Sequence, residues 1–217
     1  MKLLLVSLIS SSLGRKYIMA ATGLAAVGFL LTHLGGNLLI FAGPERFNDY
    51  AHHLHSFVLL PALEMGLFAL FAVHALFGVI LTVQNWRARP VRYAMKRKTG
   101  AGDVASRTMI YSGIGVLVFL AIHMWTVNFG VPESMSSYDR VVGALTNPVG
   151  VISYVLGILV LGLHLYHGVS STLNSLGLYN AKFDGAIGLM GKAVAIAFAV
   201  CFISIPVFVG IFVRRLG

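Results

Sequence analysis

Five long apolar stretches, nearly free of charged residues, dominate this 217-residue chain and limit what it can fold into. Each stretch exceeds the roughly 20 residues that an α-helix needs to cross a bilayer. Backbone groups in lipid must find their hydrogen bonds within the protein, which favours helices. The pattern therefore predicts an all-α membrane protein with five transmembrane helices in an up-down bundle. The predicted helices cover about residues 17–42, 57–87, 107–130, 149–177 and 189–213.

Composition supports this class and argues against others. Charged residues make up 11% of the chain, whereas soluble domains contain about a quarter. An outer-membrane barrel would show alternating segments of about ten residues, and the apolar stretches here are unbroken. The length fits a single domain over residues 1–217. The one cysteine, Cys201, allows neither an internal disulfide nor an all-cysteine metal site.

The formal charge of +9 reflects where lysine and arginine lie along the chain. Most of them lie before the first predicted helix, or in the connections after the second and fourth helices and the helix ends that border these connections. These are Lys2, Arg15, Lys16, Arg87, Arg89, Arg92, Lys96, Arg97, Lys98, Arg107, Lys182 and Lys192. The opposite side has Arg46, Arg140, Arg214 and Arg215. Because positive charge marks the cytoplasmic side, we expect the N-terminus in the cytoplasm and the C-terminus outside. Nucleic acid is not needed to explain the basic charge.

Five of the eight histidines lie within predicted helices, where a polar side chain is costly unless it has a partner. They are His33, His74, His123, His164 and His167. His33 and His74 are 41 residues apart, and so are His123 and His164. Each interval crosses one helical hairpin and returns, so these side chains are expected to face into one bundle. The alternative is that they bond to neighbouring helices or line a water cavity.

The depths of these histidines suggest two pairs. With a rise of about 1.5 Å per residue, His33 pairs with His123 nearer the outside. His74 then pairs with His164 or His167 nearer the cytoplasm. Structural zinc takes four nitrogen or sulfur ligands, whereas the iron of haem needs only axial ligands from the protein. The bundle is therefore expected to enclose two haem b groups, whose bis-histidine iron carries electrons and does not bind oxygen.

Haem propionates need cationic or hydroxyl partners on the cytoplasmic side. The candidates are Ser12, Arg15, Lys16 and Arg107. The alternative interpretation of each is an anchor that follows the positive-inside rule.

These features resemble the cytochrome b subunit of succinate:quinone oxidoreductases and fumarate reductases, in the single-chain, dihaem, five-helix class. The resemblance lies in residues 12–16, 22–23, 31–37, 62–64, 74–78, 121–125, 164–168 and 176–177. It covers nearly the whole chain, and its most specific part is four histidines in register on the first four helices. It implies that His33 and His123 ligate a distal haem and that His74 and His164 ligate a proximal one. His167, three residues further on the same helical face, is the alternative ligand.

The resemblance also implies partner subunits. A flavoprotein with FAD would oxidise succinate or reduce fumarate, and an iron–sulfur subunit would relay the electrons. This chain would anchor both in the bacterial cytoplasmic membrane and exchange electrons with a quinone, menaquinone being expected for this class. Its basic loops would form the docking surface. The sequence leaves open the direction of the reaction and whether the complex forms a dimer.

Two features on the outer side are further candidates. Glu64, in the outer part of the second helix, could handle protons at a quinone site near the distal haem. The alternative is an interfacial glutamate bonded to the fourth helix or to Ser153. The outer loop gathers acids and histidines that could form a metal site or be solvated loop residues. These are Glu45, Asp49, His52, His53 and His55.

Two other functions stay open from the sequence. One is the dihaem cytochrome b subunit of a hydrogenase or formate dehydrogenase. The other is a proton-relaying transporter, since intramembrane histidines suit proton relays. Transporters tend to contain inverted repeats and broken helices, and the five stretches show no clear Gly/Pro break at matching depth. A haem spectrum would separate the transporter from both cytochromes.

Overall fold

The computed structural model describes residues 10–88, 102–177 and 184–213, with side chains from residue 108 in the second range and from residue 185 in the third. Every element in these ranges is a helix or helical turn. Several cations that set the predicted orientation lie outside the described residues. They are Lys2, Arg89, Arg92, Lys96, Arg97, Lys98, Lys182, Arg214 and Arg215.

Within the described ranges, five helices are long and apolar enough to cross a membrane. This confirms the predicted all-α class and the predicted number of spans. The helices are α2 (Ser12–Leu38), α4 (Leu60–Arg87), α5 (Gly102–Met124), α7 (Pro148–Ser175) and α8 (Asp184–Phe208). A 3₁₀ turn, η1 (Leu39–Ala42), extends α2, and π-helical turns extend α5 and α8 as η2 (Trp125–Phe129) and η3 (Val209–Val213).

Local capping explains where two of these helices begin. The Ser11 side chain accepts a hydrogen bond from the Gly14 amide at 3.0 Å. It thereby satisfies a free donor of the first turn, and α2 begins at Ser12 rather than near residue 17 as predicted. Asn147 caps α7 in the same way through the Gly150 amide at 2.7 Å. Pro148 then occupies the first turn, where its missing amide proton costs nothing.

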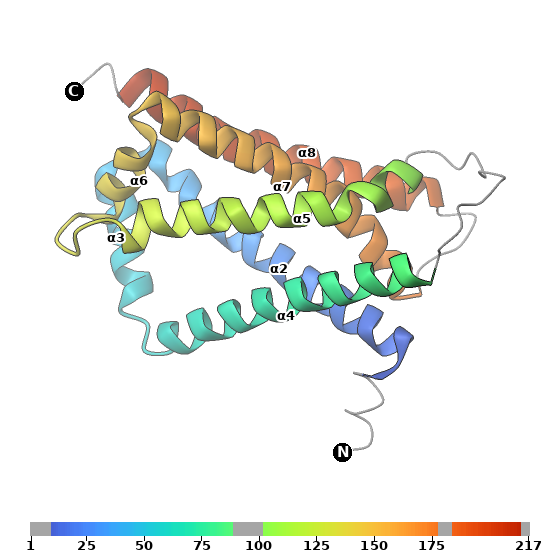
Figure 1. Ribbon diagram of the computed structural model, residues 1–217. Helices are drawn as coiled ribbons and strands as arrows, with labels where there is room; N and C mark the ends of the chain where they lie inside the picture. Colours follow the sequence, from blue (N-terminus) through green and yellow to red (C-terminus); the bar gives the residue numbers. More distant parts are fainter. Residues whose placement is uncertain (1–9, 89–101, 178–183, 214–217) are drawn as a thin grey trace.

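Two short helices, absent from the sequence prediction, lie in the connections at one end of the bundle. They are α3 (Pro44–His55) and α6 (Ser137–Leu145). Gly43 precedes α3 with a φ of +93°, a conformation that favours glycine. The two helices are tied together because the Tyr138 amide donates to the Asn48 side chain at 2.9 Å. They lie side by side at the end where α2 and α5 finish (Figure 1).

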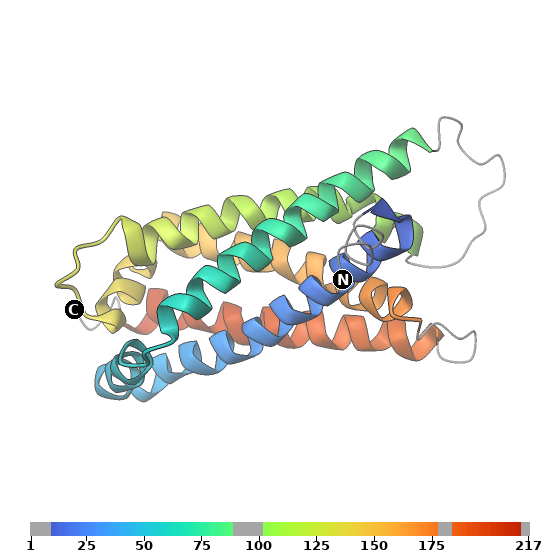
Figure 2. The ribbon, with the colours of Figure 1, turned by 90° about the horizontal axis from the view of Figure 1, so that it is seen from below.

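The long helices run alternately up and down in an elongated bundle (Figures 1 and 2). Helix α7 makes the most extensive contacts, and it packs mainly against α8, α5 and α2. Helix α4 lies mainly along α2. Helices α2 and α7 thus pack against each other and against α8, while α4 lies along α2, α5 lies along α7, and α4 and α5 touch each other.

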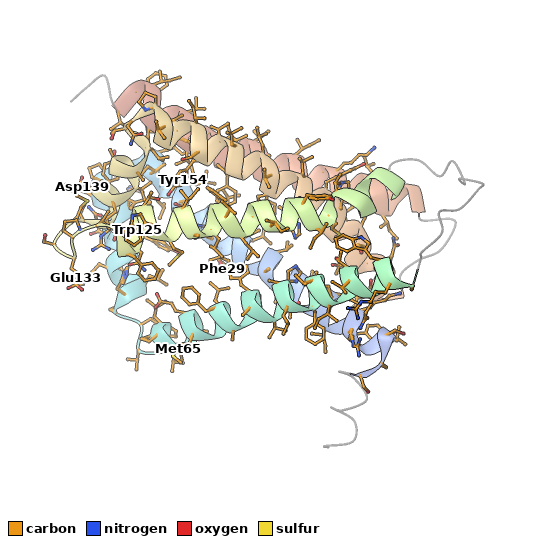
Figure 3. All side chains as sticks on the ribbon, viewed as in Figure 1. Phe29, Met65, Trp125, Glu133, Asp139 and Tyr154 are labelled. Carbon is orange, nitrogen blue, oxygen red and sulfur yellow. The ribbon has the colours of Figure 1, made fainter. Side chains whose placement is uncertain are left out.

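Buried residues form two clusters, and much of the remaining apolar surface points outward. One cluster, at the end with α3 and α6, is Ile40, Phe47, Leu145, Tyr154, Ile205 and Val209. The other, between α7 and α8, is Leu165, Ala195 and Phe198. Met65 lies on the outer side of α4 and is 74% exposed (Figure 3). Apolar side chains that point outward along all five long helices are those expected to face lipid.

Candidate functional site

Two histidines from α4 and α7 face each other in the half of the bundle where α2 begins. The ring centroids of His74 and His164 are 6.2 Å apart, with their planes at 80°. We call them the inner pair. His167 lies one turn further along α7 and has its ring 4.4 Å from that of Tyr166. The structure therefore places His164, rather than His167, opposite His74.

A second pair lies nearer the end with α3 and α6. The rings of His33 on α2 and His123 on α5 have centroids 5.8 Å apart and planes at 89°. We call them the outer pair. On α2, His33 lies eleven residues beyond Thr22, which contacts the inner pair. At a rise of about 1.5 Å per residue, the two pairs are therefore separated by roughly 16 Å along that helix.

Each ring of the inner pair has a hydroxyl partner on a neighbouring helix. Nδ1 of His74 lies 3.1 Å from the Thr22 hydroxyl on α2. Nδ1 of His164 lies 3.2 Å from the Ser112 hydroxyl on α5. The second ring nitrogen of each histidine is thus the one left for another ligand.

The outer pair is held differently. Nδ1 of His123 lies 3.3 Å from the Tyr154 hydroxyl on α7, and that hydroxyl lies 2.7 Å from the Thr126 hydroxyl. Thr126 donates to the Ile122 carbonyl at 2.9 Å. The His33 ring instead stacks on Phe29 at 5.2 Å, and the described residues give its ring nitrogens no hydrogen bond.

The geometry of both pairs fits a group whose metal needs two axial nitrogens. Metal–histidine bonds are about 2 Å for zinc, so two imidazoles on opposite sides of an ion have centroids about 6 Å apart. The observed separations of 6.2 and 5.8 Å agree with this. No group of three or more histidine, cysteine or acidic side chains that could hold a metal ion occurs among the described residues. A site built from protein ligands alone therefore fits less well than one in which a macrocycle supplies the other four.

Comparison with known proteins supplies the family. The model of a family described as the succinate dehydrogenase/fumarate reductase transmembrane subunit matches residues 87–205, more than half of the chain. The chain belongs to this family. It is also similar to the succinate dehydrogenase cytochrome b558 subunit of Bacillus subtilis (strain 168). The two are 27% identical over 158 residues, which cover 69% of this chain and 72% of that relative. No solved structure matches the chain.

The predicted propionate contacts of this transmembrane subunit lie at the start of α2. Ser12 and Lys16 are exposed and Arg15 is half-buried, and the Arg15 guanidinium donates to the Ser10 carbonyl at 2.9 Å. Arg107 lies in α5, with its side chain outside the described part of the chain. The described members of this set are thus at the end of the bundle nearer the inner pair.

The outer candidates of the subunit are not brought together. Glu64 is exposed in the second turn of α4, and no hydrogen bond or ion pair involves it among the described residues. Ser153, its suggested partner, donates to the Gly150 carbonyl at 2.9 Å. His52, His53 and His55 are exposed at the end of α3, and the described residues contain no cluster around them that could hold a metal ion.

Sequence reasoning missed the residues that hold the histidines, namely Thr22, Ser112, Thr126 and Tyr154. The sequence did contain a repeat that points to two of these residues. Thr22 and Ser112 are 90 residues apart, as are His33 and His123, and His74 and His164. Phe29 and Phe119 show the same offset and lie against His33 and His123, respectively. An internal repeat of the first two spans in the next two would have drawn attention to the hydroxyls.

Proposed function

We propose that this subunit binds two haem b groups and passes electrons between an iron–sulfur partner and a quinone in the membrane. The proposal rests on the inner and outer histidine pairs. Four helices each contribute one histidine, and the rings meet two by two at separations that suit axial ligands of one iron. The cytochrome b558 subunit to which the chain is similar adds support.

His74 and His164 would hold the inner haem, and His33 and His123 the outer one. Haem held by these pairs would supply one-electron transfer and would leave no position for oxygen. The contribution of the chain is to hold the four imidazoles and to orient them. Hydrogen bonds at Nδ1 fix His74, His164 and His123. Two phenylalanine rings, Phe29 and Phe202, flank His33.

Membership of the succinate dehydrogenase/fumarate reductase transmembrane family supports two partner subunits, a flavoprotein with FAD and an iron–sulfur protein. The dicarboxylate chemistry would lie on the flavoprotein. Family membership favours these partners over those of a hydrogenase or formate dehydrogenase. Arg15 and Lys16 lie at the start of α2, Arg87 lies at the end of α4, and Lys192 lies in the third turn of α8. These ends of the three helices share one end of the bundle (Figure 1). Their charge suits the cytoplasmic docking side of a bacterial inner-membrane protein. At the other end, Glu64 remains our candidate for proton handling near a quinone, with menaquinone as the expected species.

The first experiment is a dithionite-reduced minus oxidised spectrum of the purified chain, combined with a pyridine haemochrome count. We expect two haem b per polypeptide and a low-spin α band. A preparation of folded chain without haem would overturn the electron-transfer proposal. It would leave the hydrogen-bonded histidines to be explained by proton relay or by packing.

A further inference from the structure

The internal repeat places equivalent hydroxyls beside both histidines of the inner pair. Thr22 and His74 are 52 residues apart, and so are Ser112 and His164. In each case the hydroxyl belongs to the first helix of a repeated hairpin and the histidine to the second. The contacts are 3.1 and 3.2 Å long, so each hairpin places a hydroxyl at nearly the same distance from its histidine ring.

The proton of each hydroxyl is already committed to the backbone. Thr22 donates to the Ile18 carbonyl at 2.8 Å, with the Met19 carbonyl as a second acceptor at 3.1 Å. Ser112 donates to the Met109 carbonyl at 3.0 Å. Because a hydroxyl has one proton, the arrangement that keeps both the carbonyl contact and the histidine contact is one in which the ring N–H donates to the hydroxyl oxygen. Neutral imidazole has one N–H, so Nδ1 carries it and Nε2 keeps a free lone pair. His74 also has a backbone hydrogen bond with Met19, so Thr22 is one of two partners that α2 offers to this ring.

Glycines bring the backbone close to the same edge of each ring. A Cβ atom at Gly23 would lie 3.1 Å from Cε1 of His74, and one at Gly113 would lie 3.4 Å from Cε1 of His164. Each glycine directly follows one of the two hydroxyl residues. Each ring is thus held against a neighbouring helix along the edge that bears Nδ1 and Cε1.

Burial adds an independent observation for Ser112. Ser112 is 8% exposed, and among the described residues it is the one side chain classed as both polar and buried. A buried hydroxyl is costly unless it is hydrogen-bonded, and its partners here are the Met109 carbonyl and His164.

We propose that Thr22 and Ser112 are positioning residues for His74 and His164. They fix the Nδ1–H tautomer and the ring orientation, and they make each Nε2 more electron-rich. Acceptors of this kind raise the basicity of a metal-bound imidazole. A more basic axial ligand favours ferric iron and lowers the midpoint potential of the inner haem. This inference rests on the proposed ligation of haem by His74 and His164.

The outer pair provides an internal reference. Its hydrogen bond runs from His123 to Tyr154, and His33 is held by the rings of Phe29 and Phe202. Neither Thr22 nor Ser112 contacts these histidines in the described structure. A change at Thr22 or Ser112 should therefore act on one haem and spare the other.

The test is a redox titration of the full purified chain, comparing Thr22→Val and Ser112→Ala with the unmodified protein. We expect one of the two midpoint potentials to rise in each variant and the other to stay unchanged. Loss of such an outer-shell partner typically weakens metal binding about 10- to 100-fold, so haem transfer to excess apomyoglobin should quicken for one haem. The conservative variants Thr22→Ser and Ser112→Thr keep a hydroxyl, so their midpoint potentials and their rates of haem transfer should match those of the unmodified chain.

Two control variants remove similar hydroxyls that contact no histidine ring. Thr32→Val removes a hydroxyl on α2 that donates to the Phe29 carbonyl. Ser204→Ala removes one on α8 that donates to the Cys201 carbonyl. Both should leave the two potentials unchanged. If Thr22→Val does not accumulate, Thr22→Ala removes the hydroxyl without the bulk of valine.

The outcomes separate this inference from the proposed function. An unmodified chain without haem would sink the proposed function itself. Two haems whose potentials are the same in the unmodified chain and in the variants at Thr22 and Ser112 would overturn the positioning role alone. Equal shifts in the Thr32 and Ser204 controls would also overturn it, because the effect would then be a general one of helix packing.

Discussion

A histidine among apolar helices is costly unless its polar ring atoms find partners. In this subunit, three of the four paired histidines use Nδ1 for a hydroxyl on another helix. The rings of each pair are then left to face each other. This division of the two nitrogens allows a neutral imidazole to be anchored by the protein and still bind a metal.

Our first prediction concerns which histidine of α7, His164 or His167, binds the inner haem. Only His164 has its ring opposite His74, and only His164 contacts Ser112. We expect His164→Ala to reduce the haem count from two to one per chain. His167→Ala should keep two haems, because His167 is half-buried beside Tyr166 and faces no other histidine of the pairs.

Pyridine haemochrome analysis of both variants checks this prediction, with total protein measured separately. A His33→Ala variant serves as a positive control for loss of one haem at the other pair. The opposite pattern, with haem lost in His167→Ala and kept in His164→Ala, would show that α7 turns to present His167 when haem binds.

At this scale the sequence located the histidines but not their partners. Intramembrane histidines are rare and costly, so their spacing and depth predicted two pairs, with the partner of His74 left open between His164 and His167. Serine and threonine are common in membrane helices, where they usually bond to a carbonyl of the preceding turn. Thr22 and Thr32 both make such a bond, and only the packing of α4 against α2 distinguishes them.

Between helices, the contact of α5 with α7 connects the two histidine pairs. Each pair takes one histidine from α5 or α7, and glycines on both helices let them approach. A Cβ atom at Gly115 would lie 2.7 Å from the Val160 side chain, and one at Gly157 would overlap the Phe119 ring. Phe119 in turn packs edge-on against Tyr154 at 5.5 Å.

Gly157→Ala should therefore force α5 and α7 apart. The Phe119 ring packs against both His123 and Tyr154, so a displaced Phe119 ring would disturb the contacts of the outer pair. Overpacking of this kind costs about 1–3 kcal/mol, so we expect a lower thermal midpoint in detergent. A shift in the spectrum of the outer haem should accompany it.

Gly66→Ala is the matched control, since a Cβ atom there would meet nothing within 4 Å. It should leave the thermal midpoint and the spectrum unchanged, or raise the midpoint slightly because alanine favours a helix. Equal losses in both variants would mean that the α5–α7 contact has no special role.

The elements differ in how far the sequence predicted them. Long apolar stretches predict transmembrane helices by their length alone, and all five were predicted. Helices α3 and α6 were missed because they are short and mix charged with apolar residues, as in the stretch from Pro44 to His55. Their stability comes from contacts with each other and with the bundle end, such as that between Phe47 and Tyr138, which no local pattern reveals.

Across the whole molecule, the two ends of the bundle have different characters. One end is closed by α3 and α6 and contains the acids Glu133 and Asp139 (Figure 3). At this end Arg140 donates to the carbonyls of Pro132, Glu133 and Met135, which ties down the loop before α6. The other end has the described cations at the start of α2, at the end of α4 and in the third turn of α8.

This asymmetry predicts the orientation in the membrane. Positive charge is retained on the cytoplasmic side, so the end with the inner histidine pair should face the cytoplasm and the iron–sulfur partner. A C-terminal fusion to alkaline phosphatase should then be active, and a C-terminal fusion to green fluorescent protein should be dark. Fusions after Arg87, at the end of α4, should give the reverse pattern.

The paired fusions matter because the orientation decides the order in which electrons would meet the two proposed haem sites. With the basic end inside, electrons from the partner would reach His74 and His164 first, and the quinone would meet the end near His33 and His123. A fluorescent C-terminal fusion, together with active phosphatase after Arg87, would reverse that order. Glu64 would then lie on the cytoplasmic side, and its proposed role in proton handling would have to be reassigned to that face.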